Sequence, residues 1–199
     1  FGPGLVDKVN TTFSGGAVIY SFTGTTDSVR VEENGWGSVV AKFELNGTSA
    51  ANNIVGSAFG DVVQALDGND TVKGGDGADE IYGGAGNDIV EGGLGFDDLY
   101  GGEGDDVLDG GILGTADGSE RGRFYGGPGN DVLYGSVQQD TYFFNLGDGQ
   151  DQIFDEPFFG NGSWHFSVDD QLTFGPGITS DTINVTASGA DLLVDVSPT

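Results

Sequence analysis

The chain has 199 residues, of which 39 are glycine, and its 32 acidic and 6 basic residues give a formal net charge of -26. Hydrophobic residues make up only 36% of the chain and cysteine is absent, which leaves little for an ordinary apolar core and excludes a disulfide framework. A chain this acidic repels phosphate backbones and anionic lipids, so we expect no nucleic acid, no membrane insertion, and cations as partners.

Residues 1–55 precede the regular part of the sequence. They contain three β-rich runs separated by turn residues, namely Ala17 to Phe22, Ser28 to Glu32 and Ser38 to Leu45. Asn34-Gly35 predicts a hairpin between the last two runs. We expect 1–55 to be either a β-rich N-terminal cap or the end of a preceding domain. Since the chain begins at Phe1 and has no methionine, we expect it to be a piece of a larger protein.

A nine-residue repeat occupies residues 56–154. Aspartates recur every nine residues at Asp61, Asp70, Asp79, Asp88, Asp97 and Asp106. An apolar residue follows each aspartate by two places: Val63, Val72, Ile81, Val90, Leu99 and Leu108. This pattern predicts a six-residue turn and a three-residue strand whose middle side chain points inward. Two units would form one 18-residue coil, and coils would stack about 4.8 Å apart as two parallel sheets.

The repeat is interrupted around residues 110–123. The unit that opens at Gly110 is lengthened by an insertion, which places Gly122 where an aspartate is expected and restores the apolar position at Phe124. Residues 126–134 form a regular unit, and residues 135–143 and 146–154 form degenerate units.

Two rows of outward side chains are expected on the sheets. Tyr82, Tyr100, Tyr125 and Phe143 should form an aromatic ladder on one sheet, and Ile89, Val107 and Val132 an aliphatic stripe on the other. We expect a flanking segment to cover the stripe. The alternative is that these rows bind a surface ligand.

Residues 155–199 are expected to form a C-terminal β cap. Their apolar runs are Leu172 to Ile178, Ile183 to Val185 and Ala190 to Val194, and Ser188-Gly189-Ala190 predicts a hairpin between the last two. A cap would cover the open end of a stacked-coil structure.

The turns have the composition of a cation site. Glycine allows backbones to approach closely, so a glycine-rich turn can point several carbonyl oxygens at one centre. Stacked turns would add two carboxylates to each such centre. A flexible all-oxygen shell of six or more ligands suits calcium, whereas magnesium requires a tight octahedron and retains its waters.

GGAGNDIVE (83–91) and GGEGDDVLD (101–109) resemble the nonapeptides of the RTX (repeats-in-toxin) family, and the region from Asp169 onward resembles the C-terminal region of haemolysin-type calcium-binding proteins. The resemblance implies an all-β fold, a parallel β-roll that is a right-handed β-solenoid with 18 residues per coil. It also implies about five or more Ca²⁺ ions as cofactors.

In the family, one turn supplies its aspartate and the carbonyls of its second and fourth positions, and the turn one coil later supplies its aspartate and the carbonyls of its first and third positions. The resemblance therefore implies five sites: Asp70 with Asp88 (Leu66, Gly68, Gly83, Ala85); Asp88 with Asp106 (Gly84, Gly86, Gly101, Glu103); Asp106 with Asp131 (Gly102, Gly104, Gly126, Pro128); Asp61 with Asp79 (Ser57, Phe59, Gly74, Asp76); and Asp79 with Asp97 (Gly75, Gly77, Gly92, Leu94). A second set comprises Asp97 with Asp117, and Asp131 with Asp151, together with Gly127, Gly129 and Asp148.

No catalytic motif is evident. The only histidine, His165, lies beside Trp164 and is expected to pack in the C-terminal cap. A Gly-x-Ser-x-Gly elbow is absent, and a single histidine excludes a His-Glu-x-x-His zinc motif. Carboxylates committed to a cation cannot serve as a general acid and base. We therefore expect no enzymatic activity in this segment.

The leading interpretation is a calcium-binding module of a larger type I-secreted extracellular protein, which folds on calcium after export. One alternative is a calcium-rigidified adhesin or surface-layer segment that binds a ligand. Another is the C-terminal calcium module of a secreted enzyme or toxin. We expect a monomer that contacts other domains of its parent chain, located outside the cell or at the cell surface.

Overall fold

In the computed structural model, the described residues are 9–14, 17–22, 28–33, 39–111, 121–136, 139–154, 170–188 and 191–196. Within these ranges, side chains are described from Phe43 onward, with the exception of Ser188 and Asp191. All regular structure in these ranges is β. Within them, no helix is long and apolar enough to cross a membrane.

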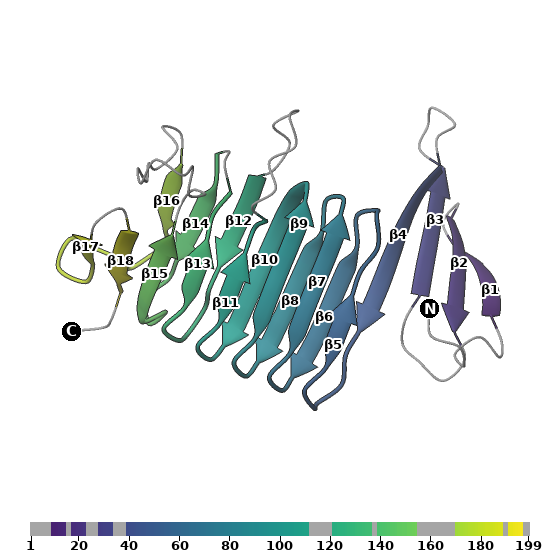
Figure 1. Cartoon of the computed structure of the whole chain (residues 1–199), viewed down its shortest axis with the longest axis horizontal. Helices are drawn as coiled ribbons and strands as arrows, with labels where there is room; N and C mark the ends of the chain where they lie inside the picture. The colour runs from purple at the N-terminus through teal and green to yellow at the C-terminus, as the bar shows by residue number, and fades with distance from the viewer. Residues whose placement is uncertain are drawn as a thin grey trace, which may run out of the picture.

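The described strands run in chain order through two sheets (Figure 1). They are β1 Val9–Ser14, β2 Ala17–Phe22, β3 Ser28–Glu33, β4 Val39–Asn46, β5 Asn53–Val55, β6 Val62–Asp67, β7 Thr71–Asp76, β8 Glu80–Ala85, β9 Ile89–Leu94, β10 Phe96–Glu103, β11 Val107–Asp109, β12 Arg121–Tyr125, β13 Val132–Tyr134, β14 Thr141–Phe144, β15 Gln150–Phe154, β16 Gln171–Phe174, β17 Asn184–Ser188 and β18 Asp191–Asp195.

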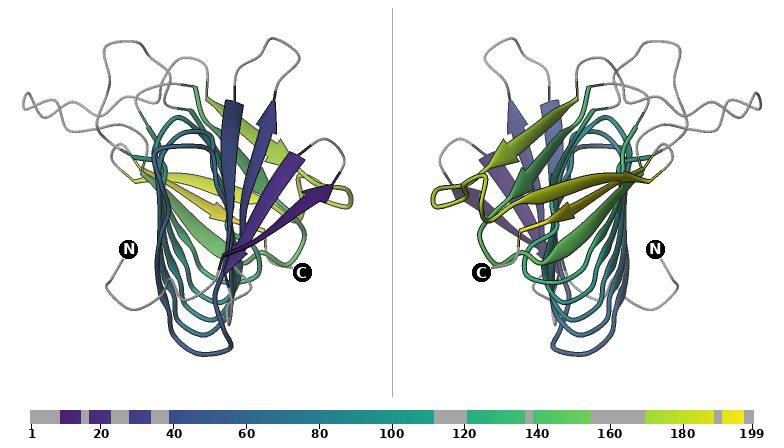
Figure 2. Two further views of the ribbon diagram at one scale, coloured as in Figure 1. Left: turned by 90° about the vertical axis from the view of Figure 1, so that its right-hand side faces the viewer. Right: turned by 90° about the vertical axis from the view of Figure 1, so that its left-hand side faces the viewer.

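The central part of the molecule is a roll of stacked coils in which consecutive strands alternate between the two sheets. One sheet has the order β1-β2-β3-β4-β6-β8-β10-β12-β14-β16, and the other has the order β17-β18-β15-β13-β11-β9-β7-β5. Val63 pairs with Ile81 and Ile81 with Leu99, so parallel partners lie 18 residues apart. Figure 2 shows the coils end-on as superimposed flattened loops. The predicted parallel β-roll is confirmed.

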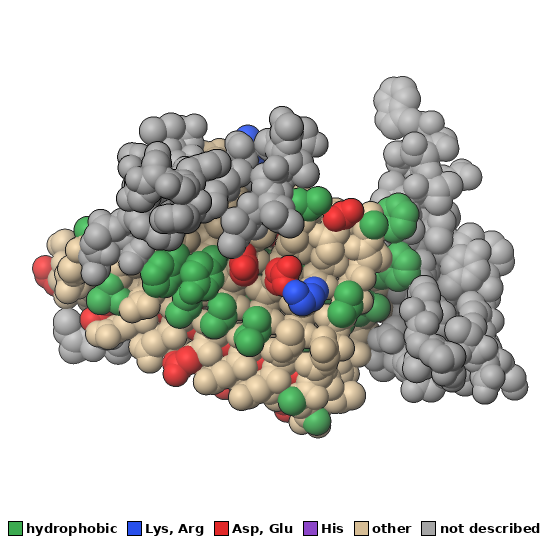
Figure 3. All heavy atoms as spheres, viewed as in Figure 1, with side chains coloured by type: hydrophobic (Ala, Val, Ile, Leu, Met, Phe, Trp, Pro, Cys, Tyr) green, Lys and Arg blue, Asp and Glu red, His purple; other side chains and the backbone are tan. Residues whose placement is uncertain are grey.

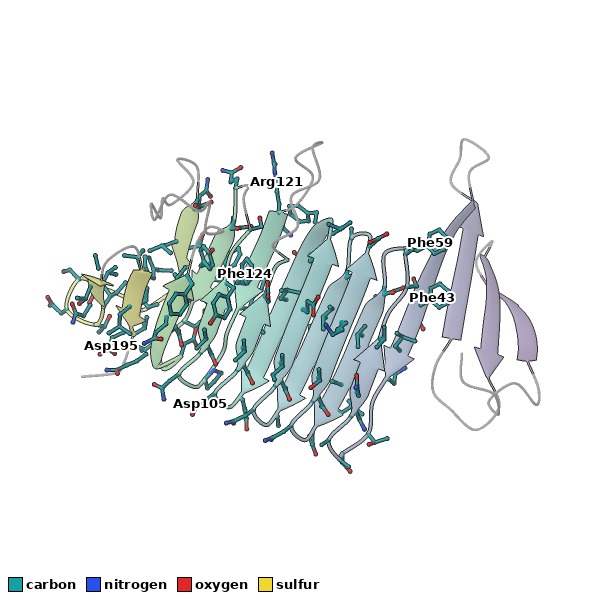
Figure 4. All side chains as sticks on the ribbon, in the orientation of Figure 1. Phe43, Phe59, Asp105, Arg121, Phe124 and Asp195 are labelled. Carbon is teal, nitrogen blue, oxygen red and sulfur yellow. The ribbon has the colours of Figure 1, made fainter. Side chains whose placement is uncertain are left out.

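The core is a single file of apolar side chains between the two sheets. Each of the six predicted inward residues has no solvent exposure: Val63, Val72, Ile81, Val90, Leu99 and Leu108. After the insertion the file continues through Phe124, as predicted, and then becomes aromatic, with Phe124 and Tyr142 stacked at 5.0 Å between ring centroids. Figure 4 shows Phe124 among the strands of the roll. Such a thin core gives each coil little apolar burial.

Pairing extends further than the predicted three-residue strands. Gly75 pairs with Gly93 and Asp76 with Leu94, so β7 and β9 each have six residues and continue into their turns. The reason is that glycine turns of successive coils are close enough to continue the parallel ladder.

The coiled region also begins earlier and continues later than residues 56–154. β5 pairs with β7 and places Ile54 beside Val72, so 47–55 is an additional unit. β16 pairs with β14 and places Leu172 beside Tyr142. The sequence pattern missed both because the first has Asn52 at its aspartate position and the second follows a long interruption of the repeat.

Both ends of the roll carry antiparallel strands. At the N-terminal end, β1 to β4 are antiparallel and β4 joins β6 in parallel. The three predicted runs correspond to β2, β3 and β4; the Asn34-Gly35 turn lies outside the described residues. At the other end, β17 and β18 pair as the predicted hairpin, and β18 pairs with β15. Val194 of β18 is fully buried in the core.

The predicted aromatic ladder is present, and its rings stack face to face. Centroid distances are 4.5 Å for Tyr82–Tyr100, 4.4 Å for Tyr100–Tyr125 and 4.3 Å for Tyr125–Phe143. Because the faces of the inner rings cover one another, mainly ring edges point outward, and the ladder stabilises neighbouring coils.

The aliphatic stripe on the other sheet is only partly covered. Ile89 is 52% exposed, and Val107 and Val132 are half-buried. The expectation that a flanking segment covers the stripe is thus wrong for Ile89. Figure 3 shows hydrophobic side chains gathered in a band on the face turned to the viewer.

The thin core predicts that each inward residue matters far more than its outward neighbours. Ile81→Ala, at a site with no exposure, should lower the free energy of unfolding in calcium by about 2–5 kcal/mol. The matched change Ile89→Ala, at a site 52% exposed, should cost less than about 1 kcal/mol. Denaturant unfolding of both variants measures the difference, and equal losses would contradict this description of the core.

Candidate metal sites

The repeated aspartates form two rows, one along each edge of the roll, which we call the Asp61 ladder and the Asp70 ladder. The Asp61 ladder comprises Asp61, Asp79, Asp97, Gly122, Asp140 and Asp170, and the Asp70 ladder comprises Asn52, Asp70, Asp88, Asp106, Asp131 and Asp151. The neighbours of Gly122 and Asp106, which are Arg121 and Asp105, lie at opposite edges (Figure 4).

Successive members of a ladder are joined by one hydrogen bond. The backbone N–H of each member donates to Oδ1 of the aspartate one coil later, as from Asp70 to Asp88 at 2.8 Å and from Asp88 to Asp106 at 2.8 Å. The Asp61 ladder is interrupted where Gly122 lies beside Asp97, because glycine offers no carboxylate. The predicted loss of an aspartate at Gly122 is therefore visible as a gap in the row.

The second carboxylate oxygen has no hydrogen-bond donor in much of the array. Oδ2 is buried and accepts no hydrogen bond in Asp70, Asp88, Asp97, Asp106, Asp131 and Asp170. The first five of these residues are each only 1% exposed. A buried carboxylate oxygen without a partner costs several kcal/mol unless a cation or a proton compensates it. These oxygens therefore require an electropositive partner.

Backbone carbonyls surround these oxygens because the turns have no side chains at critical points. A β-carbon placed on Gly83 would stand 2.5 Å from Asp88 Oδ2 and 2.6 Å from the carbonyl oxygen of Gly101. A β-carbon on Gly84 would overlap the carbonyl oxygen of Leu66 in the preceding coil. The space that glycine leaves open is thus lined by oxygen atoms from two coils.

This donor set fits calcium. In the described part of the chain, no three Asp, Glu or His side chains come together as a metal-binding group, so side chains alone do not complete a shell. Paired carboxylates with turn carbonyls form a flexible all-oxygen environment, which Ca²⁺ accepts and Mg²⁺ disfavours.

Burial changes the acidity of the ladder in the ion-free chain. It raises the pKa of Asp97, Asp106 and Asp131 to about 7 from an ordinary value of 3.8, although a backbone N–H bond lowers each in part. Burial likewise raises the pKa of Asp151 to about 8, with the neighbouring Asp131 carboxylate acting in the same direction. Protons are therefore the competitors of a metal ion at these positions.

The ladders bring together the aspartate pairs that were predicted to share ions. Asp70, Asp88, Asp106 and Asp131 are consecutive in one ladder, and Asp61, Asp79 and Asp97 in the other. In the second predicted set, Asp131 and Asp151 are also joined, because the backbone N–H of Asp131 donates to Asp151 Oδ1 at 2.9 Å. Asp148 instead accepts a hydrogen bond from Asn145 within its own turn. Asp117 lies outside the described residues, as does the predicted packing of His165 and Trp164.

The predicted ion sites did not include three ladder members, although Asp140 was recognised as the aspartate of the degenerate unit 135–143. Asp140 and Asp170 continue the Asp61 ladder beyond Gly122, and Asn52 begins the Asp70 ladder. Asp140 stands four residues after Gly135-Ser136, the same spacing as Asp61 after Gly56-Ser57, and this spacing was the available signal. Nothing in the repeat pattern pointed to Asp170, since the intervening segment breaks the period.

Comparison with known protein families matches the description RTX calcium-binding nonapeptide repeat. The matched segments are 46–81, 55–90, 64–99, 82–112 and 118–153, which together span just over half of the chain. No curated protein gives a significant sequence match to the chain. The matched segments include the additional unit at 47–55 and most of both ladders.

The raised pKa values predict that protonation of the ladder aspartates at acidic pH partly replaces a metal ion in stabilising the folded chain. Because the folded pKa of Asp97, Asp106 and Asp131 is raised to about 7, the ion-free folded state binds protons that the unfolded chain has released. Its free energy of unfolding should be greatest below about pH 4 and should fall as the pH rises through about 7. Circular dichroism of calcium-stripped protein should therefore show more β-structure at pH 5 than at pH 8. The opposite order would contradict the assignment of buried, uncompensated carboxylates.

Proposed function

We propose, since the chain belongs to the family of RTX calcium-binding nonapeptide repeats, that it is a calcium-triggered folding module of a larger secreted protein. The observation that carries the proposal is the row of buried carboxylate oxygens without hydrogen-bond donors, repeated in coil after coil. Calcium supplies the compensating charge that this arrangement requires. Folding and calcium binding are then a single process.

Four shared sites are supported by these oxygens. They lie between Asp70 and Asp88, Asp88 and Asp106, Asp106 and Asp131, and Asp79 and Asp97, with the carbonyls of the adjoining turns as further ligands. Asp131 with Asp151 is a fifth candidate. Each of Asp88 and Asp106 would contribute to two sites, so loss of either would affect two ions.

The net charge explains why folding would depend on location. With a formal charge of -26 and a core one side chain wide, the ion-free chain gains little from collapse at neutral pH and pays for every buried carboxylate. Where calcium is scarce, as inside a cell, the chain stays extended and suited to export through a type I channel. Where calcium is abundant, binding to the folded state alone stabilises it by mass action.

Among the alternatives, a sugar-stacking adhesin surface is the least supported by the described residues. The inner rings of the aromatic ladder, Tyr100 and Tyr125, have both faces covered by neighbouring rings. A stacking platform for a sugar needs an open ring face. A role beside an enzyme or toxin domain of the parent chain remains compatible with the same calcium-dependent module.

The direct test is a far-UV circular dichroism titration of chelator-treated protein with calcium and, separately, with magnesium, at pH 7.5. We expect a cooperative change from coil to β-structure with calcium and little change with magnesium at the same concentration. A chain that is fully folded in chelator at this pH would contradict the proposal, because the carboxylates would then need no cation.

Adjacent aspartates in one turn provide a matched pair of variants. Asp106→Asn removes the charge of a ladder carboxylate that is only 1% exposed. Asp105→Asn removes the same charge at the exposed neighbouring position. An asparagine is already tolerated there, because the preceding coil has Asn87 and the following coil has Asn130 at the equivalent place. D106N should raise the midpoint calcium concentration at least about tenfold, which corresponds to about 1.4 kcal/mol. D105N should leave the midpoint within about twofold, and equal shifts would show that net charge alone governs binding.

A further inference from the structure

In three of the described units, the ladder side chain accepts hydrogen bonds from a hydroxyl residue of its own turn. In each, the second residue of the unit has a hydroxyl group, and its backbone N–H and hydroxyl both contact the ladder side chain four residues later. We call this arrangement the hydroxyl clamp. It joins Thr48 to Asn52, Ser57 to Asp61 and Ser136 to Asp140.

The two serine clamps are nearly identical although they lie in different parts of the roll. Ser57 donates its N–H to Asp61 Oδ2 at 2.6 Å and its hydroxyl to Oδ1 at 3.1 Å. Ser136 donates to the same two atoms of Asp140 at 2.6 and 3.2 Å. A third donor completes each set, namely the N–H of Phe43 for Asp61 at 3.3 Å and that of Gly122 for Asp140 at 2.6 Å. Both oxygens of each carboxylate are therefore compensated by the chain itself.

The backbone of the second position accounts for the difference. Leu66, Gly84 and Gly102 occupy this position in other units with φ values of 79°, 120° and 119°. The corresponding aspartates, Asp70, Asp88 and Asp106, have Oδ2 atoms that accept no hydrogen bond. Leu66 is the only described non-glycine residue with positive φ, so Ser57, Ser136 and Thr48 are outside this region. In these units a left-handed second residue accompanies an open carboxylate, whereas a hydroxyl residue whose φ is not positive accompanies a closed ladder side chain.

The first clamp shows that no negative charge is needed there. Thr48 donates its N–H to Asn52 Oδ1 at 2.6 Å, and the amide of Asn52 donates back to the Thr48 hydroxyl at 3.0 Å. The neutral Asn52 still occupies the ladder position, and its backbone N–H donates a hydrogen bond to Asp70 Oδ1 at 2.6 Å. An asparagine therefore does in this unit what Asp61 does in the next one along the chain.

We propose that the second residue of each unit decides whether the ladder side chain is a calcium ligand. The Thr48 and Ser57 clamps close the first position of the two ladders without calcium, and the Ser136 clamp closes the position that follows Gly122. On this basis Asp61 and Asp140 are structural hydrogen-bond acceptors, and the site predicted between Asp61 and Asp79 takes no ion through Asp61. The inference rests on the proposed calcium binding of the open carboxylates and adds a rule for which turns bind.

The rule is consistent with the position of Asp61. The neighbouring strand in the same sheet, β4, has Phe43 at the place equivalent to Asp61. Phe43 offers a backbone N–H to Asp61 but no carboxylate. A clamp that needs no cation therefore suits a coil whose outer neighbour supplies no acidic ligand.

Native mass spectrometry of the calcium-loaded chain tests the rule by counting bound ions. The Asp61→Asn variant should bind the same number of ions as the unsubstituted chain. The reason is that Asn52, held by Thr48, already occupies a ladder position without a negative charge. The matched variant Asp88→Asn, in a unit with Gly84 at its second position, should bind fewer ions by one or two. Loss of an ion from D61N would overturn the rule.

Ser57→Gly provides an independent arm if D61N does not fold. Glycine removes the hydroxyl and permits the left-handed conformation of the other units, so Asp61 should open and the count should rise by one. An unchanged count in S57G would overturn the rule. If the unsubstituted chain binds no calcium at all, the proposed function fails instead, so the two failures are distinguishable.

Discussion

A buried carboxylate oxygen with no hydrogen-bond donor is the constraint on which the structure depends. Oδ1 of a typical ladder aspartate, such as Asp88, accepts the N–H of the preceding coil, and Oδ2 is left without a partner. Stacking repeats this arrangement with every coil, so the electrostatic cost grows with the length of the roll. A divalent cation between coils removes that cost and joins the coils at the same time.

The other features of the sequence follow from this constraint. Glycines at positions such as Gly83 and Gly84 clear the space that two coils line with oxygen atoms. Core residues such as Leu99 are single and fully buried, which defines the register of each coil but provides little stability of its own. The stacked ring pairs, such as Tyr82 with Tyr100, add contacts between coils on the outer face. In the proposed function, calcium binding supplies the stability that this thin core does not provide.

The regular part of the fold was predictable because one period determines it. A spacing of nine with an apolar residue two places after each aspartate specifies two sheets, an inward side chain and a row of carboxylates, and the structure has all three. The additional unit with Asn52 and the later coil with Asp170 were not predictable, because each departs from the glycine and aspartate pattern. The hydroxyl clamps were not predictable either, because the hydrogen bonds that Ser57 makes to Asp61 became visible only in the folded turn.

The positions of the calcium ions are measured most directly by a calcium anomalous difference map from crystals grown with calcium. We predict peaks in line along the Asp70 ladder, each between consecutive aspartates such as Asp88 and Asp106 and within bonding distance of turn carbonyls. Well-ordered ladders without anomalous peaks, with the carboxylates instead hydrogen-bonded to one another, would contradict this prediction.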